Sequence, residues 1–346
     1  MQGLLWSSCT AGEVQLPADH TSLLAARDGA RLAYHEHLWK RLHEVQSRLA
    51  KLGIQTAAAK GVAAEDRWYD RTGERPSNDI DLLLEPGGAA RLTDVLDELQ
   101  PRHPLREEIA ALVRTGVLQS VDLLVDGVPI DLHVDLLKVE IPTRGAEALW
   151  SRTYEMTSKA GLQVRVIDAE TSLVHFAIHL NKDRFARLLA YTDVARLLAL
   201  ESLDWGFIES FVVREGLRVP VFNSLHAVTT GLDVPPPPVP RQDHGWRAMA
   251  WNRLWPADRH LSGSRGMSSR HHRQLWIPWL ATGRVWDAFL WWLRRRVLPP
   301  GSLLRLYDPD VTGPYPLRLV VGRLRGWRRR RRAALGTRRA EQGPRP

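Results

Sequence analysis

The segment RPSNDIDLLL, residues 75–84, places two acidic residues at the start of an apolar run. If this run forms a β-strand, side chains two positions apart share a face, so Asp79 and Asp81 point outward together. Ile80 and Leu82 then point into the core. Two adjacent carboxylates repel each other unless a hard divalent cation such as Mg²⁺ binds both through oxygen. The segment therefore predicts a metal site on a strand and, with it, metal-assisted phosphoryl or nucleotidyl transfer.

A third carboxylate for this site is predicted in a β-hairpin further along the chain. Residues 121–125 and 128–134 predict two strands joined by Asp-Gly, a favoured two-residue turn. In the second strand the core face holds Ile130, Leu132 and Val134, and the opposite face holds Asp131, His133 and Asp135. A two-metal site needs a carboxylate beyond the first pair, and Asp131 would supply it from a neighbouring strand.

A phosphate-binding turn is predicted upstream of the acidic pair. Residues 55–61, QTAAAKG, are typical of a short strand that enters a turn, and residues 62–69 predict a helix. Lys60 at this turn would bring a positive charge to a phosphate group. Gly61 would let the backbone approach the phosphate closely.

Together these segments resemble the uncharacterised nucleotidyltransferase family of the DNA polymerase β-like superfamily. The shared features are the lysine-glycine turn, a Trp-Tyr pair at 68–69, an arginine before an Asp-Ile-Asp strand, and a strand of the form hydrophobic-Asp-Leu-His. The resemblance continues through residues 172–198, a helical segment that contains His175, His179, Arg187 and Asp193. The wider superfamily has a Gly-Ser pair before its acidic strand. Here the lysine-glycine turn and a longer insert stand in that place.

The resemblance implies an α+β fold, in which a small mixed β-sheet nucleotidyltransferase domain with flanking helices precedes a mainly helical C-terminal region. It implies transfer of a nucleoside monophosphate from a nucleoside triphosphate, with ATP as the expected donor. The acceptor stays open between a protein, a peptide, RNA and a small molecule. Two Mg²⁺ ions are expected, with Mn²⁺ as the alternative. The predicted catalytic and metal-binding residues are Asp79, Asp81 and Asp131, and the predicted nucleotide-binding residues are Lys60, Gly61, Arg75, Asn78, Lys182 and Arg187.

Long helical patterns surround the motifs. Residues 22–52, 89–99, 173–200 and 205–234 predict helices, and Asp168 is a predicted helix cap. His175 and His179 share a helix face, but no third ligand accompanies them, so we interpret them as packing or hydrogen-bonding residues. Asp193 is expected to pair with Lys182 or Arg187.

The 346 residues divide into five predicted regions. These are an N-terminal helical segment (1–53), the catalytic domain (54–167), a helical domain (168–234), a Trp/Arg-rich C-terminal region (235–322) and a basic, disordered tail (323–346). The formal net charge is +9, and the arginine run at 328–332 accounts for much of it, so a uniformly basic face is not implied. The Trp/Arg-rich region is a candidate nucleic-acid surface, although packing of a small helical unit explains it as well.

The single cysteine, Cys9, excludes an intramolecular disulfide and favours a cytoplasmic location. No stretch reaches the length that a membrane-spanning helix needs. Oligomeric state and base preference stay open. Two alternative functions are a kinase that uses the same site and a catalytically inactive protein that binds RNA or a peptide.

Overall fold

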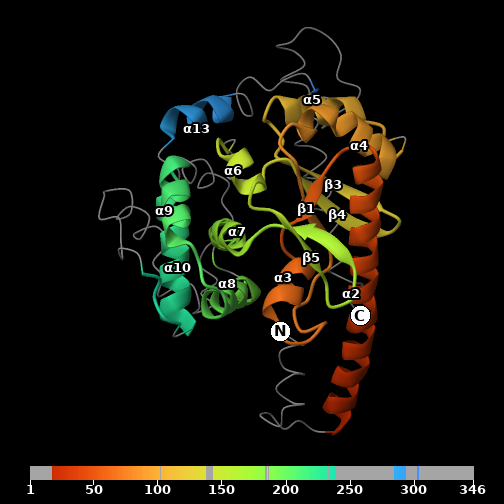
Figure 1. The fold of residues 1–346 in the computed structure, drawn as a ribbon, viewed down its shortest axis with the longest axis vertical. Helices are drawn as coiled ribbons and strands as arrows, with labels where there is room; N and C mark the ends of the chain where they lie inside the picture. The colour runs from red at the N-terminus through yellow and green to blue at the C-terminus, as the bar shows by residue number, and fades with distance from the viewer. Residues whose placement is uncertain are drawn as a thin grey trace, which may run out of the picture.

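A mixed β-sheet flanked by helices forms the centre of the molecule (Figure 1). The computed structural model describes residues 18–101, 103–137, 143–183, 185, 187–232, 234–238, 284–293 and 302–303. Within these ranges six strands pair in the order β3-β4-β2-β1-β6-β5. The strands are β1 (Thr56–Ala58), β2 (Ile80–Leu84), β3 (Ser120–Val125), β4 (Val128–His133), β5 (Tyr154–Thr157) and β6 (Gln163–Val166). The predicted mixed sheet with flanking helices is thereby confirmed.

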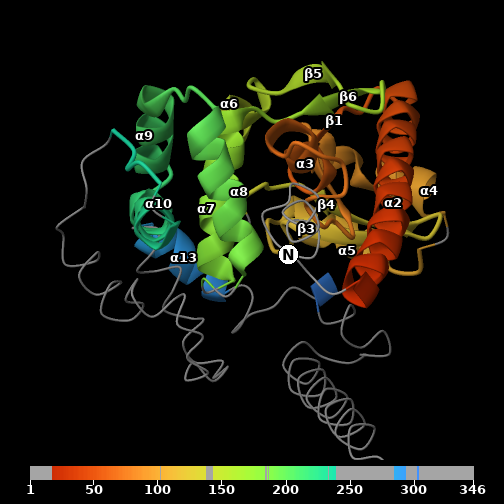
Figure 2. The same ribbon diagram turned by 90° about the horizontal axis from the view of Figure 1, so that it is seen from below.

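Helices lie on both sides of this sheet (Figure 2). On one side are α2 (Ala18–Lys51), η1 (Gly88–Arg91), α4 (Leu92–Leu99) and α5 (Arg106–Arg114). On the other side are α7 (Ala169–Lys182), α8 (Leu188–Leu200), α9 (Trp205–Arg214) and α10 (Arg218–Leu232). The shorter helices α3 (Val62–Trp68) and α6 (Ala146–Trp150) lie in connections, and α13 is the helix Val285–Trp292.

Each face of the sheet has its own hydrophobic core. Ile80 and Leu82 of β2 pack in the core that contains α2 and α4, whereas Leu83 packs in the core that contains α7 to α10. Asp81 alternates with Ile80 and Leu82, so it lies on the face covered by α7, and it is only 1% exposed. The expectation that this face points outward is therefore wrong at Asp81. Helices cover it because β2 and β4 are parallel neighbours, an arrangement that is usually buried on both faces.

Helix α2 confirms the helical pattern predicted for residues 22–52. Leu38, Leu42, Val45 and Leu49 recur at helical spacing and are fully buried in the core beside the sheet. Burial of a side chain of this size contributes roughly 1.5–3 kcal/mol. Gly53 follows the helix with φ of 70°, the left-handed conformation in which helices commonly end.

The predicted hairpin is present as β3 and β4. The two strands are antiparallel, with Val125 opposite Val128. Asp126 and Gly127 connect them with φ of 48° and 82°, and a type I′ turn requires positive φ at both positions. This tight turn fixes the register of β4 against β3, in which Asp131 lies opposite Asp122.

The helical segment at 173–200 differs from the single helix that its pattern predicts. The structure has two helices there, α7 and α8, and Phe185 lies between them with φ of 58°, which an α-helix cannot contain. The predicted cap of α7 is confirmed, because Asp168 Oδ1 accepts a hydrogen bond from Thr171 N at 2.9 Å. Strand β5 is a further element that the sequence patterns did not indicate.

Most of the C-terminal sequence lies outside the described residues. This holds for the basic tail at 323–346 and for nearly all of the Trp/Arg-rich region. The described part of that region includes α13, whose neighbour Arg284 lies 3.5 Å from Glu215 Oε2. Asp287 of α13 accepts a hydrogen bond from Arg144 at 2.6 Å. These ion pairs join α13 to the rest of the described fold.

Candidate metal and nucleotide site

Strand pairing brings three separate segments together at one point of the sheet. β2 and β4 run parallel, and Asp81 is the direct register partner of Asp131. β1 runs antiparallel to β2, so the Lys60-Gly61 turn that follows β1 lies beside the start of β2. Ala59 N donates a hydrogen bond to the carbonyl of Asp81 at 3.0 Å and fixes this approach.

A buried histidine joins the two carboxylates. His133 Nε2 lies 3.0 Å from Asp81 Oδ1 and 3.5 Å from Asp131 Oδ2. One ligand atom from each of these three residues lies within 4.8 Å of the other two. The strand pattern places His133 on this face, but the sequence interpretation gave it no role. Its position two residues after Asp131 on a strand is the signal that could have indicated one.

Asp81 is a charged group held in the interior by two partners. Burial alone would raise the pKa of its carboxyl, but the hydrogen bond from His133 and the positive charge of Lys60 outweigh burial and lower it. The Nζ atom of Lys60 lies 3.0 Å from Asp81 Oδ1. Asp81 is therefore ionised, and since a carboxylate only accepts hydrogen bonds, His133 Nε2 carries the hydrogen between them.

Asp79 lies just before β2, outside the tight cluster of Asp81, Asp131 and His133. Burial raises the pKa of the Asp79 carboxyl, and the negative charges of Asp81 and Asp131 raise it further. Lys60 acts in the opposite direction. The membership of Asp79 in one metal site with Asp81 and Asp131 stays a prediction.

The residues at this point fit a divalent cation. The Oδ2 atom of Asp81 is buried and has no hydrogen-bond partner in the part of the chain that the structure describes. A buried carboxylate oxygen without a partner carries a large desolvation penalty, which a cation would remove. Carboxylate oxygens are the ligands that Mg²⁺ prefers, whereas coordination by the imidazole of His133 would favour a transition metal.

The lysine-glycine turn passes very close to the acidic strand. Gly61 has φ of 61° and ψ of −121°, a conformation that residues with a side chain rarely adopt. A Cβ atom at this position would lie 2.7 Å from Ser77 Oγ and 3.3 Å from the carbonyl oxygen of Asp79. The absence of a side chain at Gly61 thus permits the contact that brings Lys60 to Asp81.

Arg75 was predicted to contact phosphate, but in the structure its guanidinium contacts other groups of the protein. Its Nε and Nη2 atoms each donate a hydrogen bond to the carboxylate of Asp193, both at 2.8 Å. Its Nη1 atom donates to the carbonyl of Gly61 at 3.3 Å. The expectation that Asp193 pairs with Lys182 or Arg187 is therefore wrong, because α8 turns this carboxylate toward Arg75. A direct contact of Arg75 with phosphate stays a prediction, and it would require the Asp193 pair to open.

The other predicted nucleotide-binding residues lie around the acidic cluster or at the surface. Asn78 is exposed, and its carbonyl oxygen accepts a hydrogen bond from Tyr34 at 3.1 Å. Lys182 is exposed in the last turn of α7. Arg187 is 74% exposed and forms an ion pair with Asp183 at 3.2 Å. Their predicted contacts with the nucleotide stay predictions.

Two further histidines lie next to the site. The His133 and His175 rings meet edge to face with centroids 5.8 Å apart, and the centroids of His175 and His179 are 4.5 Å apart. Burial lowers the pKa of His179 well below its usual value, and the neighbouring His175, Lys60 and Lys182 lower it further. The imidazole of His179 is therefore neutral. The sequence could not indicate that His133, His175 and His179 lie next to one another, because His133 and His175 come from distant segments.

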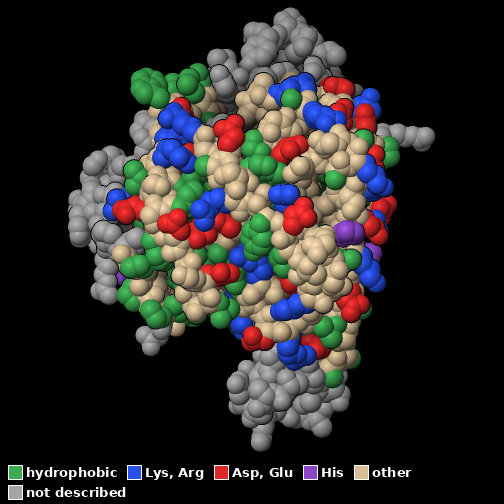
Figure 3. Space-filling view, in the orientation of Figure 1, with side chains coloured by type: hydrophobic (Ala, Val, Ile, Leu, Met, Phe, Trp, Pro, Cys, Tyr) green, Lys and Arg blue, Asp and Glu red, His purple; other side chains and the backbone are tan. Residues whose placement is uncertain are grey.

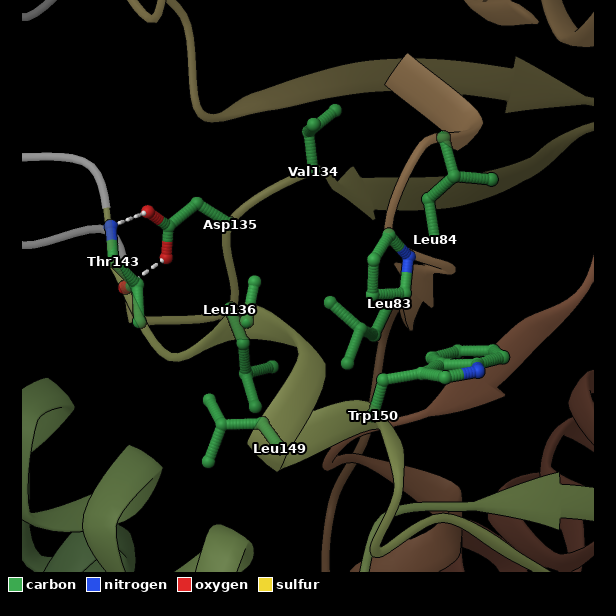
Figure 4. Close-up of a pocket in the computed structure, with 10 residues that line it drawn as sticks. Leu83, Leu84, Val134, Asp135, Leu136, Thr143, Leu149 and Trp150 are labelled. Atoms are coloured by element: carbon green, nitrogen blue, oxygen red, sulfur yellow. Dashed lines mark hydrogen bonds between the residues drawn. The ribbon is translucent and has the colours of Figure 1, made fainter. Parts of the chain in front are cut away.

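Asp135 does not join the acidic cluster, although strand alternation predicts it on the same face. It follows the end of β4 and accepts hydrogen bonds from Thr143 N and Thr143 Oγ1, both at 2.6 Å (Figure 4). It lines a cavity of about 20 Å³ together with mostly apolar side chains, including Leu83, Leu149 and Trp150. That volume is close to the minimum that one water molecule needs, so this cavity is too small for a nucleotide.

One face of the molecule is mixed in charge. On the face that Figure 3 shows, Lys and Arg side chains alternate with Asp and Glu side chains and do not gather by sign. Within the described residues, no helix combines the length and the apolar character that crossing a membrane requires.

The fold and the site together define an α/β protein with a metal-compatible acidic centre on its sheet. The sequence model of the family described as uncharacterised nucleotidyltransferase matches residues 1–232. The chain belongs to this family, which confirms the resemblance inferred from the motifs. A comparison with curated proteins found no match to the chain.

Proposed function

We propose that the chain is a metal-dependent nucleotidyltransferase that transfers a nucleoside monophosphate from a nucleoside triphosphate, ATP by expectation, to an acceptor. The observation that carries this proposal is the direct register of Asp81 and Asp131 on neighbouring parallel strands, beside the Lys60-Gly61 turn. Membership of a nucleotidyltransferase family supports the same reaction class.

Each residue of the site has a separate task in this proposal. Asp79, Asp81 and Asp131 would hold Mg²⁺, or Mn²⁺ in its place. The metal, as two bound ions, would supply charge neutralisation and activation of the acceptor oxygen or nitrogen. Lys60, already 3.0 Å from Asp81, would neutralise phosphate charge, and Gly61 would let the phosphates approach the backbone.

The reaction follows from the donor and the site chemistry. The acceptor attacks the α-phosphorus of the triphosphate, the bond to the β-phosphate breaks, and pyrophosphate leaves. The preorganised positive charge of Lys60 would stabilise the negative charge of the reacting phosphate better than water does, because it does not need to reorient, and Asp81 would act through the metal that it holds. The protein thus contributes mainly positioning and electrostatic stabilisation.

Several finer features belong to this proposal. The predicted domain division places the chemistry within residues 54–167 and the helical domain at 168–234. Asn78, Lys182 and Arg187 would contact the nucleotide from the edge of the site. The acceptor is a protein, peptide, RNA or small molecule, and the Trp/Arg-rich region would contact nucleic acid if RNA is the acceptor. A cytoplasmic location accords with the single cysteine.

The direct test uses the purified chain with each α-labelled nucleoside triphosphate and Mg²⁺. Pyrophosphate release and label transfer are measured beside the double variant Asp79→Asn/Asp81→Asn. Release that the double variant lacks establishes nucleotidyl transfer. Release of a nucleoside diphosphate with a γ-labelled substrate would instead identify a kinase. Absence of both turnover and metal-dependent triphosphate binding would contradict the proposal and favour the binding-protein alternative.

A further inference from the structure

We propose that Arg75 and Asp193 form a positioning pair that holds the Lys60-Gly61 turn in place from helix α8, so that Arg75 acts on bound phosphate through the turn and not by contact. The effect on activity rests on the proposed function. The effect on the turn itself does not, because it concerns contacts that are present without nucleotide.

The pair is buried and geometrically complete. Arg75 is 7% exposed and Asp193 is 3% exposed, and two parallel hydrogen bonds of 2.8 Å join them. This two-bond arrangement is the strong and orientationally specific form of an arginine-carboxylate contact. The third nitrogen of Arg75 donates to the carbonyls of Gly61 at 3.3 Å and Pro76 at 3.4 Å. Every guanidinium nitrogen of Arg75 therefore has an acceptor within the protein.

The contact with Gly61 falls at the most constrained residue of the site. The carbonyl of Gly61 accepts hydrogen bonds from Arg75 Nη1 and also from Glu65 N, at 3.1 Å, in the first turn of α3. Because Gly61 lies against Ser77 and Asp79, its peptide group has little space in which to move. Lys60 is bonded directly to Gly61, so a displacement of Gly61 would change the position of the Lys60 side chain relative to Asp81.

Further contacts tie the pair to three helices. Tyr69, which directly follows α3, donates a hydrogen bond from its hydroxyl to Asp193 Oδ1 at 2.7 Å. Glu65 of α3 accepts a hydrogen bond from Arg75 N at 3.1 Å, and its carboxylate also contacts the ring of His35 of α2. Helices α2, α3 and α8 thus converge on Arg75. The position of the turn depends on the packing of α8, which lies far away in the sequence.

The two roles of Arg75 predict opposite effects of Asp193→Asn. If Arg75 contacts phosphate directly, Asp193 competes with the phosphate for the guanidinium, and removal of its charge leaves nucleotide binding unchanged or tighter. If Arg75 positions the turn, removal of the Asp193 charge loosens Arg75 and weakens nucleotide binding. If Arg75 positions the turn, the double variant Arg75→Lys/Asp193→Asn should bind nucleotide no more weakly than the weaker of the two single variants, because both substitutions act through one contact.

The first measurement is amide hydrogen exchange of the full chain without nucleotide. The amides of Ala63 and Glu65 donate to the carbonyls of Lys60 and Gly61, so they report the turn directly. We expect both to exchange about tenfold faster in Asp193→Asn, with the amides of β4 unchanged. The matched control is Glu201→Gln, which removes the charge of the residue that follows α8 and accepts hydrogen bonds from Arg67 and Trp68 of α3, but which does not reach the turn.

The second measurement is steady-state kinetics with Mg²⁺ and the triphosphate that the wild type uses. Arg75→Lys and Asp193→Asn should each raise KM for the triphosphate about tenfold or more, with a smaller effect on kcat. If Asp193→Asn does not fold, Tyr69→Phe removes one hydrogen bond to Asp193 and should change exchange and KM in the same direction by a smaller factor. Unchanged exchange at the turn, or an unchanged or lower KM in Asp193→Asn or Tyr69→Phe, would overturn the inference. A wild type without triphosphate turnover would contradict the proposed function alone, since the exchange measurement needs no nucleotide.

Discussion

Asp81 on β2 lies directly opposite Asp131 on β4, and His133 Nε2 is within 3.5 Å of an oxygen of each carboxylate. Parallel pairing makes this relationship rigid, because a slip of either strand by one residue would turn its aspartate to the other face of the sheet. The cluster is therefore held by the backbone ladder itself and not by flexible loops. Such rigidity is what a site that works by charge positioning requires.

Asp81→Asn and Asp79→Asn should each lower nucleotidyl transfer at least about a hundredfold, because each removes a charge that the metal and the reacting phosphate require. Pyrophosphate release measured over a range of Mg²⁺ concentrations checks this. The control is Asp94→Asn, which should retain wild-type turnover. Asp94 is an exposed residue of α4 that forms an ion pair with Arg91. Retention of most turnover in both site variants would reject the mechanism.

His133→Ala should weaken metal binding about 10- to 100-fold, the usual effect of removing a residue that orients a metal ligand. His133→Gln keeps a hydrogen-bond donor near Asp81 Oδ1 and should recover part of this affinity. Titration of the protein with Mn²⁺, followed by electron paramagnetic resonance, measures both. Equal loss in the two variants would mean that His133 acts as a metal ligand and not as an orienting donor.

Gly61→Ala should destabilise the protein more than Gly87→Ala, by about 1–3 kcal/mol. Both glycines have positive φ, but Gly61, with ψ of −121°, lies in a region that residues with a side chain rarely adopt, whereas Gly87, with ψ of −23°, lies in the left-handed region. In addition, only a Cβ at Gly61 meets another atom, Ser77 Oγ at 2.7 Å. Urea unfolding measures the difference. The double variant Gly61→Ala/Ser77→Ala removes that clash and should regain stability. If it does not, the penalty at Gly61 comes from the backbone alone.

Tyr69→Phe and Tyr191→Phe should change stability in opposite directions. The Tyr69 hydroxyl donates to Asp193, so its loss leaves a buried carboxylate with one donor fewer and should lower the free energy of unfolding by about 1–3 kcal/mol. The Tyr191 hydroxyl is buried and has no hydrogen-bond partner among the described residues, so its removal should be neutral or stabilising by up to about 1 kcal/mol. Urea unfolding of the two variants at neutral pH decides this. Destabilisation by Tyr191→Phe would show that its hydroxyl does have a partner.

Alkaline pH should destabilise the wild type through Tyr191. Burial raises the pKa of this phenol to about 12. Since an unfolded tyrosine ionises near about 10, the unfolded state releases its proton first. The stability that the neutral phenol contributes is therefore fully present below pH 10. As pH rises toward 12, the free energy of unfolding falls by about 1–2 kcal/mol through this group. The difference in unfolding free energy between wild type and Tyr191→Phe, followed from pH 8 to 11.5, isolates this contribution. A difference that does not change with pH would contradict the predicted shift.

The local patterns around the acidic strands were sufficient to predict much of the site. Alternation in residues 80–84 and 128–134, with an Asp-Gly turn before the second strand, placed Asp81, Asp131 and His133 on one face, as observed. The lysine-glycine turn was likewise predictable, because small residues and a glycine indicate a strand that ends in a close backbone approach. These features depend on side-chain period and turn chemistry, which act over a few residues.

Other features depended on contacts between distant segments. Burial of Asp81 under α7 depends on how separate layers of the fold pack. The contact of Asp81 with His133, the pairing of Asp193 with Arg75 and the contact of His133 with His175 join residues 52, 118 and 42 positions apart. The break between α7 and α8 was not predicted, although the polar residues 181–184 interrupt the apolar pattern there. No local rule specifies which cation a buried aspartate meets, since the choice follows from how whole helices pack.

By itself, the sequence determined the acidic strands, the hairpin register, the lysine-glycine turn and the family, because short-range periodicity and turn residues encode them. Tertiary structure decided which partners the buried carboxylates have: Lys60 and His133 contact Asp81, and Arg75 contacts Asp193. The physical reason is the low dielectric of the interior. There an ion pair forms wherever packing brings opposite charges together, regardless of their separation along the chain.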